Sequence, residues 1–308
     1  MDHIQKPREP THPPTHAGEE QSRHVDVLIV NFRTGDLSAK AAAGVHGPGV
    51  HVYVWDNSGE MLTEPPAHAF MFGDGTNTWF APANNRLAEQ CNGEFLLLLN
   101  PDVELTYDGL SALVAAADRH PLAWSVAPRL LNPDGTDQDY LQRLPDASAL
   151  LADRLPPLRR HGLRAAYSRF MAEDVDLRLE QVVEQPPAAC LLVRRANAGV
   201  PLFDERYRLF FNDTDLARRQ NLVGQCWLIP SITATHLRGE SFRREKPRTG
   251  YAIAREYDRS LLTYARCNVR WWQVLVPIIV ARLIASHLSD LVQGTRNGLG
   301  SQRPRRHR

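Results

Sequence analysis

Three short runs of nearly continuous apolar residues constrain the fold of this chain more than any other feature. They cover residues 25–30, 50–55 and 94–99, and polar turn-forming residues follow each of them at once. Runs of this length without polar alternation are typical of parallel strands that are buried on both faces. Their alternation with helical patterns predicts an open α/β sheet with helices on both faces. The intervening helices and a fourth strand are expected at 37–45, 83–90, 110–119 and, for the strand, 124–128.

Polar side chains stand at the end of each of the first three strands. These are Asn31, Asp56 and, after the third strand, Asn100 with Asp102. In open α/β sheets ligands bind outside the carboxyl ends of the strands, so these side chains are expected at one ligand-binding edge. A carboxylate there can accept hydrogen bonds from a nucleobase or a ribose, and another can hold Mg²⁺ or Mn²⁺. Any one of them taken alone is more often a simple turn former.

The second half of the chain continues with mixed elements. Residues 145–184 are rich in leucine, arginine and alanine and predict a helical insertion beside the active face. Further strands are expected at 188–194 and 225–229, and a helix at 251–266. The charged segment 238–250, punctuated by glycine and proline, is typical of a surface loop.

Charge and cysteine usage exclude several classes of protein. Lys plus Arg total 36 and Asp plus Glu total 35, which gives a formal net charge of +1. A dedicated nucleic-acid binder normally carries a strong basic excess, so we expect no nucleic-acid partner. The cysteines form no CxxC pair and no Cys/His cluster, which argues against a structural zinc site and a disulfide framework.

The two ends of the chain differ from its body. Residues 1–23 are rich in Pro, His, Glu and Gln and lack the apolar run of a secretory signal, so we expect a solvated tail and a cytoplasmic location. Residues 271–285 are apolar but are interrupted and shorter than the roughly 20 residues of a membrane span. Two interpretations stay open for them: a membrane-surface helix, helped by the basic tail 303–308, or a helix packed on protein.

A series of sequence blocks, taken together, is more specific than any single residue. In order and spacing these blocks resemble inverting glycosyltransferases of family 2, and in particular their rhamnosyltransferase-like branch. The resemblance covers roughly residues 25–266. Its blocks are VLIVNF at 27–32, VWDNS at 54–58, the segment 77–85, LLNPDV at 98–103, PDG at 133–135, FDE at 203–205, FFNDTDL at 210–216, and His236 with Gly239 and Ser241.

This resemblance implies a GT-A fold, with a Rossmann-like, mostly parallel nucleotide-binding sheet, followed by a C-terminal helical extension. The expected organisation is a GT-A domain over 24–266, divided into a nucleotide-sugar half at 24–136 and an acceptor half at 137–266. The apolar or amphipathic helix and the basic tail then occupy 267–308.

The resemblance also implies roles for individual residues. Asp213 matches the base that deprotonates the acceptor hydroxyl, and Asp102 matches the last carboxylate of a DxD metal motif. His236 matches a histidine that completes the metal or diphosphate site. The expected cofactor is Mn²⁺ or Mg²⁺. The expected contacts to the nucleotide or the donor sugar are Asn31, Asp56, Asn77, Asn84 and Asn85.

One further donor contact comes from the residues alone. Arg143 follows the Pro-Asp-Gly turn and could offer its guanidinium to phosphate, although a solvated loop arginine is an equally good interpretation. Two positions depart from the family pattern. Trp79 stands where the branch usually has a small residue, and Asn212 replaces an acidic residue beside Asp213. The lost negative neighbour should lower the pKa of Asp213 relative to a pair of acids.

The expected reaction is transfer of a sugar, such as rhamnose, from a dTDP- or UDP-linked donor. The acceptor is expected to be a glycan or a lipid-linked glycan, with a peripheral membrane contact as an option. Two alternatives stay open. A sugar nucleotidyltransferase needs a glycine-rich phosphate loop after the first strand, and residues 31–35 hold a single glycine. A catalytically silent homologue could instead bind nucleotide-sugar as a scaffold in glycan assembly, which Trp79 and Asn212 motivate.

Overall fold

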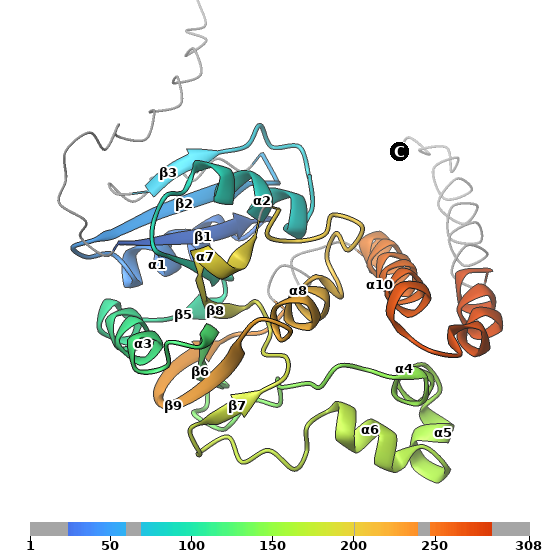
Figure 1. Cartoon of the computed structure of the whole chain (residues 1–308). Helices are drawn as coiled ribbons and strands as arrows, with labels where there is room; N and C mark the ends of the chain where they lie inside the picture. The colour runs from blue at the N-terminus through green and yellow to red at the C-terminus, as the bar shows by residue number, and fades with distance from the viewer. Residues whose placement is uncertain (1–23, 60–68, 200, 240–246, 285–308) are drawn as a thin grey trace, which may run out of the picture.

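One mixed sheet contains all the strands of the described residues (Figure 1). The computed structural model describes residues 24–59, 69–199, 201–239 and 247–284. Within these ranges the strand order is β3-β2-β1-β4-β8-β6-β9-β5, and β7 pairs with β9. The strands are β1 Val25–Asn31, β2 Val50–Asp56, β3 Ala69–Phe72, β4 Phe95–Leu99, β5 Val103–Glu104, β6 Ala123–Leu131, β7 Gln181–Val183, β8 Cys190–Arg194 and β9 Gln225–His236.

Strand direction divides the sheet into two parts. β3, β2, β1 and β4 run parallel to one another, which places the carboxyl ends of β1 and β2 side by side, with Asn31 opposite Asp56. β8 runs antiparallel between β4 and β6, and β6 pairs in parallel with β9. All the predicted strands are present. The short strands β3, β5 and β7 were not predicted.

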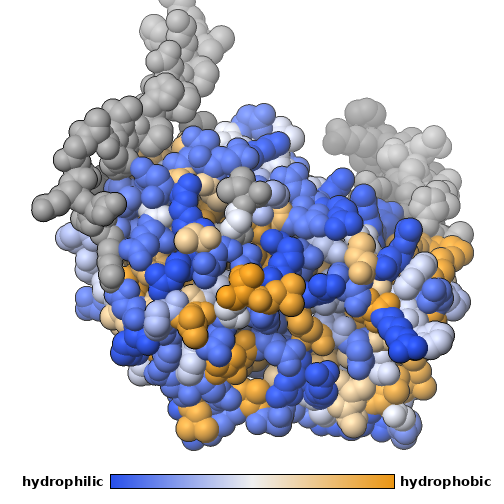
Figure 2. All heavy atoms as spheres, in the orientation of Figure 1, coloured by the Kyte–Doolittle hydropathy of each residue, from blue (hydrophilic) through white to orange (hydrophobic). Residues whose placement is uncertain are grey.

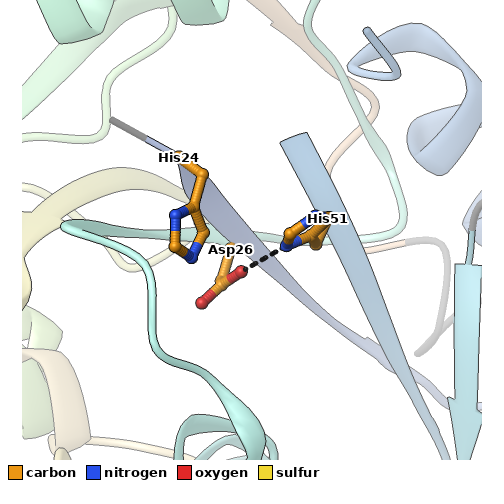
Figure 3. Close-up of side chains that lie close together, drawn as sticks. All are labelled: His24, Asp26 and His51. Atoms are coloured by element: carbon orange, nitrogen blue, oxygen red, sulfur yellow. Dashed lines mark ion pairs between the residues drawn. The ribbon is translucent and has the colours of Figure 1, made fainter. Parts of the chain in front are cut away.

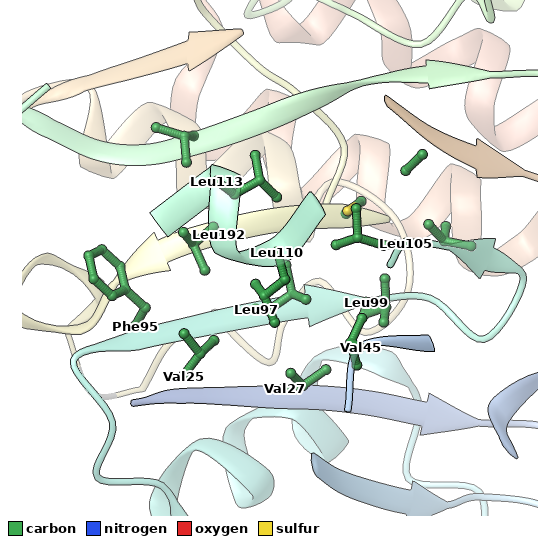
Figure 4. Close-up of a cluster of buried hydrophobic side chains, with 14 of the residues drawn as sticks. Val25, Val27, Val45, Phe95, Leu97, Leu99, Leu105, Leu110, Leu113 and Leu192 are labelled. Atoms are coloured by element: carbon green, nitrogen blue, oxygen red, sulfur yellow. The ribbon is translucent and has the colours of Figure 1, made fainter. Parts of the chain in front are cut away.

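Helices cover both faces of the sheet because its strands bury side chains on both faces. In β4, Phe95, Leu97 and Leu99 belong to one core, while Leu96 and Leu98 belong to the other. Helices α1 and α3 pack on the first core, shown in Figure 4, and α2 and α8 pack on the second. The bounds are α1 Gly35–Gly44, α2 Phe80–Gln90, α3 Tyr107–Arg119, α7 Arg195–Ala198 and α8 Asn212–Gln220.

A third, smaller core joins the helical insertion to the C-terminal part of the chain. Leu150 of α4, Tyr264 of α10 and Leu275 of the 3-10 helix η1 are buried together in it. The predicted helical insertion is present and supplies the first of these residues. The helices concerned are α4 Ala147–Arg154, α5 Pro156–His161, α6 Arg164–Phe170, α10 Pro247–Asn268 and η1 Trp272–Leu275.

The segment expected at 271–285 has one face on protein and one in solvent. Residues 276–284 are helical, and Leu275 and Ile279 are fully buried in the third core. Trp271 and Ile284 are 65% and 56% exposed. No helix within the described ranges is both long and apolar enough to cross a membrane. The predicted tail at 1–23, Ser241 and the basic tail lie outside the described residues.

The two expected halves of the GT-A domain share one sheet. β6, which belongs to the first half, lies between β8 and β9 of the second. Residues 136 and 137, where the halves were expected to meet, lie in the turn that follows β6. The division at that point stays a prediction.

Candidate functional site

A pocket of about 580 Å³ opens at the carboxyl edge of the sheet, where a ligand site was predicted. Its size suits a nucleotide-sized ligand. Four of the predicted site residues line it: Asn77, Asp102, Asp213 and His236. They come from the loop before α2, the turn after β4, the first turn of α8 and the end of β9.

Asp102 and His236 are brought together by the short antiparallel pairing of β5 with β9. Val103 lies opposite His236 in that pairing, and the N–H of Leu237 donates to the backbone carbonyl of Asp102. Nε2 of His236 is 3.4 Å from Oδ1 of Asp102. Both side chains are largely buried.

Gln138 orients the His236 ring from its other side. Its Oε1 lies 2.8 Å from Nδ1 of His236, while its Nε2 donates to the His236 carbonyl and to Asn132. With both amide hydrogens used, Oε1 is the acceptor, so Nδ1 of His236 carries the proton. A neutral His236 then presents the Nε2 lone pair toward the Asp102 carboxylate.

This donor set fits a divalent cation. Two acceptor atoms that face each other at 3.4 Å repel unless a proton or a cation lies between them. The ring is fixed by a hydrogen bond from its other nitrogen, as is usual for metal-binding histidines. One carboxylate and one imidazole suit Mn²⁺ well, and Mg²⁺ less well because it prefers oxygen.

Asp213 stands at the start of α8, in a backbone turn that its neighbour makes possible. Phe211 has a positive φ of 63° and turns the chain into the helix. The N–H of Thr214 donates to Oδ1 of Asp213 at 2.8 Å. Burial raises the pKa of Asp213, and hydrogen bonds from backbone N–H groups, that of Thr214 first, oppose the rise. The carboxyl is therefore a stronger base than an exposed aspartate when it is ionised.

Asn212 supplies a buried donor beside that carboxylate. Its Oδ1 accepts from the N–H of Asp213 at 2.7 Å, whereas its buried Nδ2 has no hydrogen-bond partner in the described part of the chain. Asn212 also lines the pocket. A buried unsatisfied N–H is costly, so a ligand oxygen is a natural partner for it.

Asn31 and Asp56 form a buried hydrogen-bonded pair at the ends of β1 and β2. Nδ2 of Asn31 donates to Oδ1 of Asp56 at 3.0 Å, and Oδ1 of Asn31 accepts from Thr34 and Ser38. Ser58 donates twice to the same Oδ1 of Asp56. The side chain of Asn31 is thus hydrogen-bonded within the protein. The hydrogen bonds from Asn31 and Ser58 to Asp56 all go to its Oδ1 and not to its Oδ2.

Asn57 fastens the loop before α2 to the end of β2. Its Oδ1 accepts from Trp55 Nε1, Thr78 N and Thr78 Oγ1, and its Nδ2 donates to the carbonyl of Trp79. The N–H of Trp79 donates to Oδ1 of Asn77 at 2.8 Å. Between these anchors Trp79 has a φ of 70°, where a residue with a Cβ is strained.

Besides Asn31 and Asp56, three further predicted donor contacts lie outside the pocket lining. Nδ2 of Asn84 donates to the Phe80 carbonyl within α2, and Asn85 exchanges hydrogen bonds with the backbone of Phe203. Arg143 makes two hydrogen bonds to the carboxylate of Asp174. Their roles at the donor stay predictions, and the geometry gives each a structural role.

Sequence reasoning missed three residues that shape the site. Asn57 and Gln138 hold pocket residues in place, and Arg238 is, within the described residues, the one Lys or Arg side chain in the pocket lining. Arg238 stands two residues after His236, and this short spacing could have indicated from the sequence that Arg238 lies at the same site. Gln138 gave none, because its bond to His236 spans 98 positions.

The chain is similar in sequence to a curated glycosyltransferase. No family profile matches the chain. It is 27% identical over 216 residues, 65% of this chain and 67% of the relative, to the N-acetylglucosaminyl-diphospho-decaprenol L-rhamnosyltransferase of Mycobacterium tuberculosis, in strains CDC 1551 and H37Rv alike.

The structure also superposes on those of solved proteins. The mannosyltransferase PcManGT of Pyrobaculum calidifontis, solved with GDP-Man and Mn²⁺, superposes with a TM-score of 0.51 at 13% identity, over 96% of this chain and 85% of its own. S. aureus TarS, residues 1–349, superposes with a TM-score of 0.47 at 14% identity, over 86% of this chain and 72% of its own. The PcManGT superposition confirms the expected GT-A fold. The sequence likeness to the M. tuberculosis rhamnosyltransferase agrees with the expected enzyme class, so the chain is a relative of the glycosyltransferases.

Proposed function

We propose that this chain is an inverting glycosyltransferase that moves a sugar from a nucleoside-diphosphate donor to a hydroxyl of a glycan or lipid-linked glycan, with Asp213 as general base. One observation carries the proposal. Asp213 and the Asp102–His236 pair come from distant parts of the sequence, yet they line one pocket at the carboxyl edge of the sheet. A base and a cation site facing one cavity are what a single displacement with a diphosphate leaving group requires.

The pocket would hold the donor by its base and its diphosphate. Asp56 does not line the pocket itself but directly precedes Asn57, which does, and its Oδ2 would accept from the imide N–H of uracil or thymine. Asp102 and His236 would hold Mn²⁺ or Mg²⁺, which when bound neutralises charge on the diphosphate. Arg238, which also lines the pocket, would supply a second positive charge there.

The reaction would be one in-line step. Asp213 takes the proton of the acceptor hydroxyl as that oxygen forms its bond to the anomeric carbon. The bond from this carbon to the diphosphate oxygen breaks on the opposite face, and the nucleoside diphosphate leaves with the electron pair. The single displacement inverts the configuration of the anomeric carbon, because the acceptor attacks from the face opposite the leaving group. No second carboxylate takes part to form a covalent intermediate.

The sugar and the acceptor are inferred from the relatives. The name of the M. tuberculosis relative states transfer of L-rhamnose to a lipid-linked N-acetylglucosamine diphosphate. We infer a dTDP-rhamnose donor, with UDP-sugars as the next choice, a lipid-linked acceptor and a role in cell-wall polysaccharide synthesis. A peripheral membrane contact agrees with the exposed apolar side chains Trp271 and Ile284 beside the third core. Figure 2 shows hydrophobic surface at that side of the molecule.

The test is release of nucleotide from a panel of nucleotide-sugars, with Mn²⁺, Mg²⁺ or EDTA. We expect turnover of one donor in the wild type and its loss with EDTA and in Asp102→Ala. Asp213→Asn should lose turnover by at least about 100-fold, as for loss of a general base, while still binding the donor. Thr214→Ala, which leaves the N–H of residue 214 in place, is the matched control. If the donor binds and Asp213→Asn turns over like wild type, Asp213 is not the base. If wild type binds donor without turnover, the silent scaffold is the better interpretation.

A further inference from the structure

A second group of metal-ligating side chains lies at the opposite end of the same strands. His24 directly precedes β1, and Asp26 and His51 are the second residues of β1 and β2. Asp26 and His51 are paired in register, and Figure 3 shows all three side chains together. Five residues, about 16 Å at 3.3 Å each, separate Asp26 from Asn31 at the pocket edge. The group is therefore separate from the Asp102–His236 site.

Asp26 is a fully buried carboxylate with one oxygen held and the other unsatisfied. Its Oδ2 accepts from the backbone N–H groups of Asn92 and Gly93, at 2.9 and 2.6 Å. Its Oδ1 is buried and has no hydrogen bond among the described residues. No Lys or Arg of those residues pairs with it, and its one ion-pair partner there is His51. A buried charge with so little compensation is costly.

The two imidazoles complete a set of three ligand atoms around that oxygen. Nδ1 of His51 is 3.4 Å from Oδ1 of Asp26, and one ligand atom from each residue lies within 4.8 Å of the others. A charge-assisted hydrogen bond would be about 2.8 Å long. Two ligands of a tetrahedral zinc ion, each about 2.1 Å from the metal, lie about 3.4 Å apart.

The segment that follows α2 orients two of the three ligands. Nε2 of His24 lies 2.8 Å from Oδ1 of Asn92, and a neutral ring that donates from Nε2 carries its lone pair on Nδ1. The same segment holds Oδ2 of Asp26 through two backbone N–H groups, which turns Oδ1 toward the histidines. Outer hydrogen bonds of this kind are what metal-binding histidines and carboxylates have in proteins.

We propose that His24, Asp26 and His51 bind a divalent transition-metal ion of the zinc class, distinct from the cation at the donor pocket. Two imidazoles and one carboxylate suit Zn²⁺, Co²⁺ and Ni²⁺, whereas Mg²⁺ and Ca²⁺ take oxygen ligands. With three protein ligands the ion would keep an open position for water. Through its ligands the ion would join the start of β1 to the start of β2, so it would stabilise this end of the sheet.

Titration of the purified full-length chain with Co²⁺ tests the site, because Co²⁺ replaces Zn²⁺ and its visible absorption reports the coordination. We expect one equivalent with the bands of a low-coordinate site, and a higher melting temperature with Zn²⁺ than with EDTA. His51→Asn and His24→Asn should weaken this binding by at least about tenfold, the lower end of what loss of even an outer hydrogen-bond partner costs. Asp102→Asn and His161→Asn, an exposed control at the end of α5, should retain it.

Three results would overturn the proposal. Absence of Co²⁺ bands in the wild type would mean that Asp26 pairs with a protonated His51 instead. Equal binding in wild type and His51→Asn would place the ion elsewhere, for instance on the histidines at positions 3, 12 and 16. Loss of the bands in Asp102→Asn alone would assign them to the donor pocket. Circular dichroism with EDTA establishes that each variant is folded.

Discussion

At the scale of single residues, Asn212 adjoins the proposed base Asp213, at a position where the family that the sequence resembles has an acid. The asparagine removes a like charge from the neighbourhood of the base, yet burial still raises the pKa of Asp213. Burial therefore outweighs the hydrogen bonds to the carboxylate, which lower its pKa. In the proposed mechanism Asp213 acts as base when it is ionised, so we expect activity to be lost as the pH falls through this raised pKa.

The pH profile of an Asn212→Asp variant tests this account. A second carboxylate next to Asp213 disfavours its ionised form, so the acid limb of kcat/KM should move to higher pH. Thr214→Ala removes one weak hydroxyl contact of 3.4 Å and should move the limb far less. An acid limb in Asn212→Asp that stays in place, or moves to lower pH, contradicts the proposed role of Asp213.

Trp79 has a backbone conformation that a residue with a side chain rarely adopts. At a φ of 70° glycine is unstrained, which explains why a small residue is usual at this position in the family that the sequence resembles. Trp79→Gly and Trp79→Ala both delete the ring, but only glycine relieves the strain. We expect the glycine variant to be more stable than the alanine variant by about 1 kcal/mol. Thermal unfolding of the two measures this, and equal stability would show that the turn is not strained.

Arg238 and Arg143 were both considered as phosphate contacts, and their surroundings in the structure differ. Arg238 lines the pocket, whereas Arg143 is held by Asp174. We expect Arg238→Ala to raise the KM for the donor roughly tenfold, the cost of about one charge-assisted contact, and Arg143→Ala to leave KM unchanged. Steady-state kinetics over a range of donor concentrations decides it, and a raised KM in Arg143→Ala would restore that residue to the phosphate site.

At the scale of elements, the buried strands and their polar ends could be predicted because those signals are local. Continuous apolar runs specify β1, β2 and β4, and their last residues mark the ligand edge. Asp102, Asp213 and His236 were found by resemblance, and all three line the pocket. The pairing of β5 with β9 that joins two of them could not be predicted, because a two-residue strand leaves no periodic pattern.

The partners of amide side chains, in contrast, could not be predicted from the sequence. Asn85 occurs in a matching block, but its hydrogen bonds go to Phe203 and Glu205, 118 and 120 positions away. No local pattern tells an amide that braces two elements from one that faces a ligand. Asn57 is the converse case, since its four bonds to the ring of Trp55 and the loop before α2 hold a wall of the pocket and were not anticipated.

The loop that Asn57 holds gives a prediction at the same scale. Asn57→Ala removes those bonds and should lower the free energy of unfolding by about 2 kcal/mol, given about 0.5–1.5 kcal/mol for each bond and some replacement by water. The freed loop should also raise the KM for the donor more than it lowers kcat. Urea unfolding together with donor kinetics checks both, and an unchanged KM would mean that this loop does not contact the donor.

At the scale of the whole molecule, the C-terminal helical extension presents an apolar surface on the side away from its core. Leu275 and Ile279 face the third core, while Trp271 and Val280 are 65% and 43% exposed. We expect a Trp271→Ser/Val280→Ser variant to bind anionic vesicles several-fold less than wild type, since burial of apolar area drives such binding. Vesicle sedimentation measures it. A Leu222→Ser/Val223→Ser variant, exposed at the end of α8, is the matched control, and equal loss in both would exclude a specific membrane face.

The order of strands in the sheet also determines how long a newly made strand waits for its partner during synthesis of the chain. Phe95 of β4 pairs with Arg194 of β8, which the ribosome adds 99 residues later. At about 5–20 residues per second, this edge of β4 waits roughly 5–20 s for its partner. During that time the apolar leucines of β4 and its unpaired backbone groups are open to other nascent chains. Yield in cells should therefore depend on chaperones that cover the first half of the chain until β8 arrives.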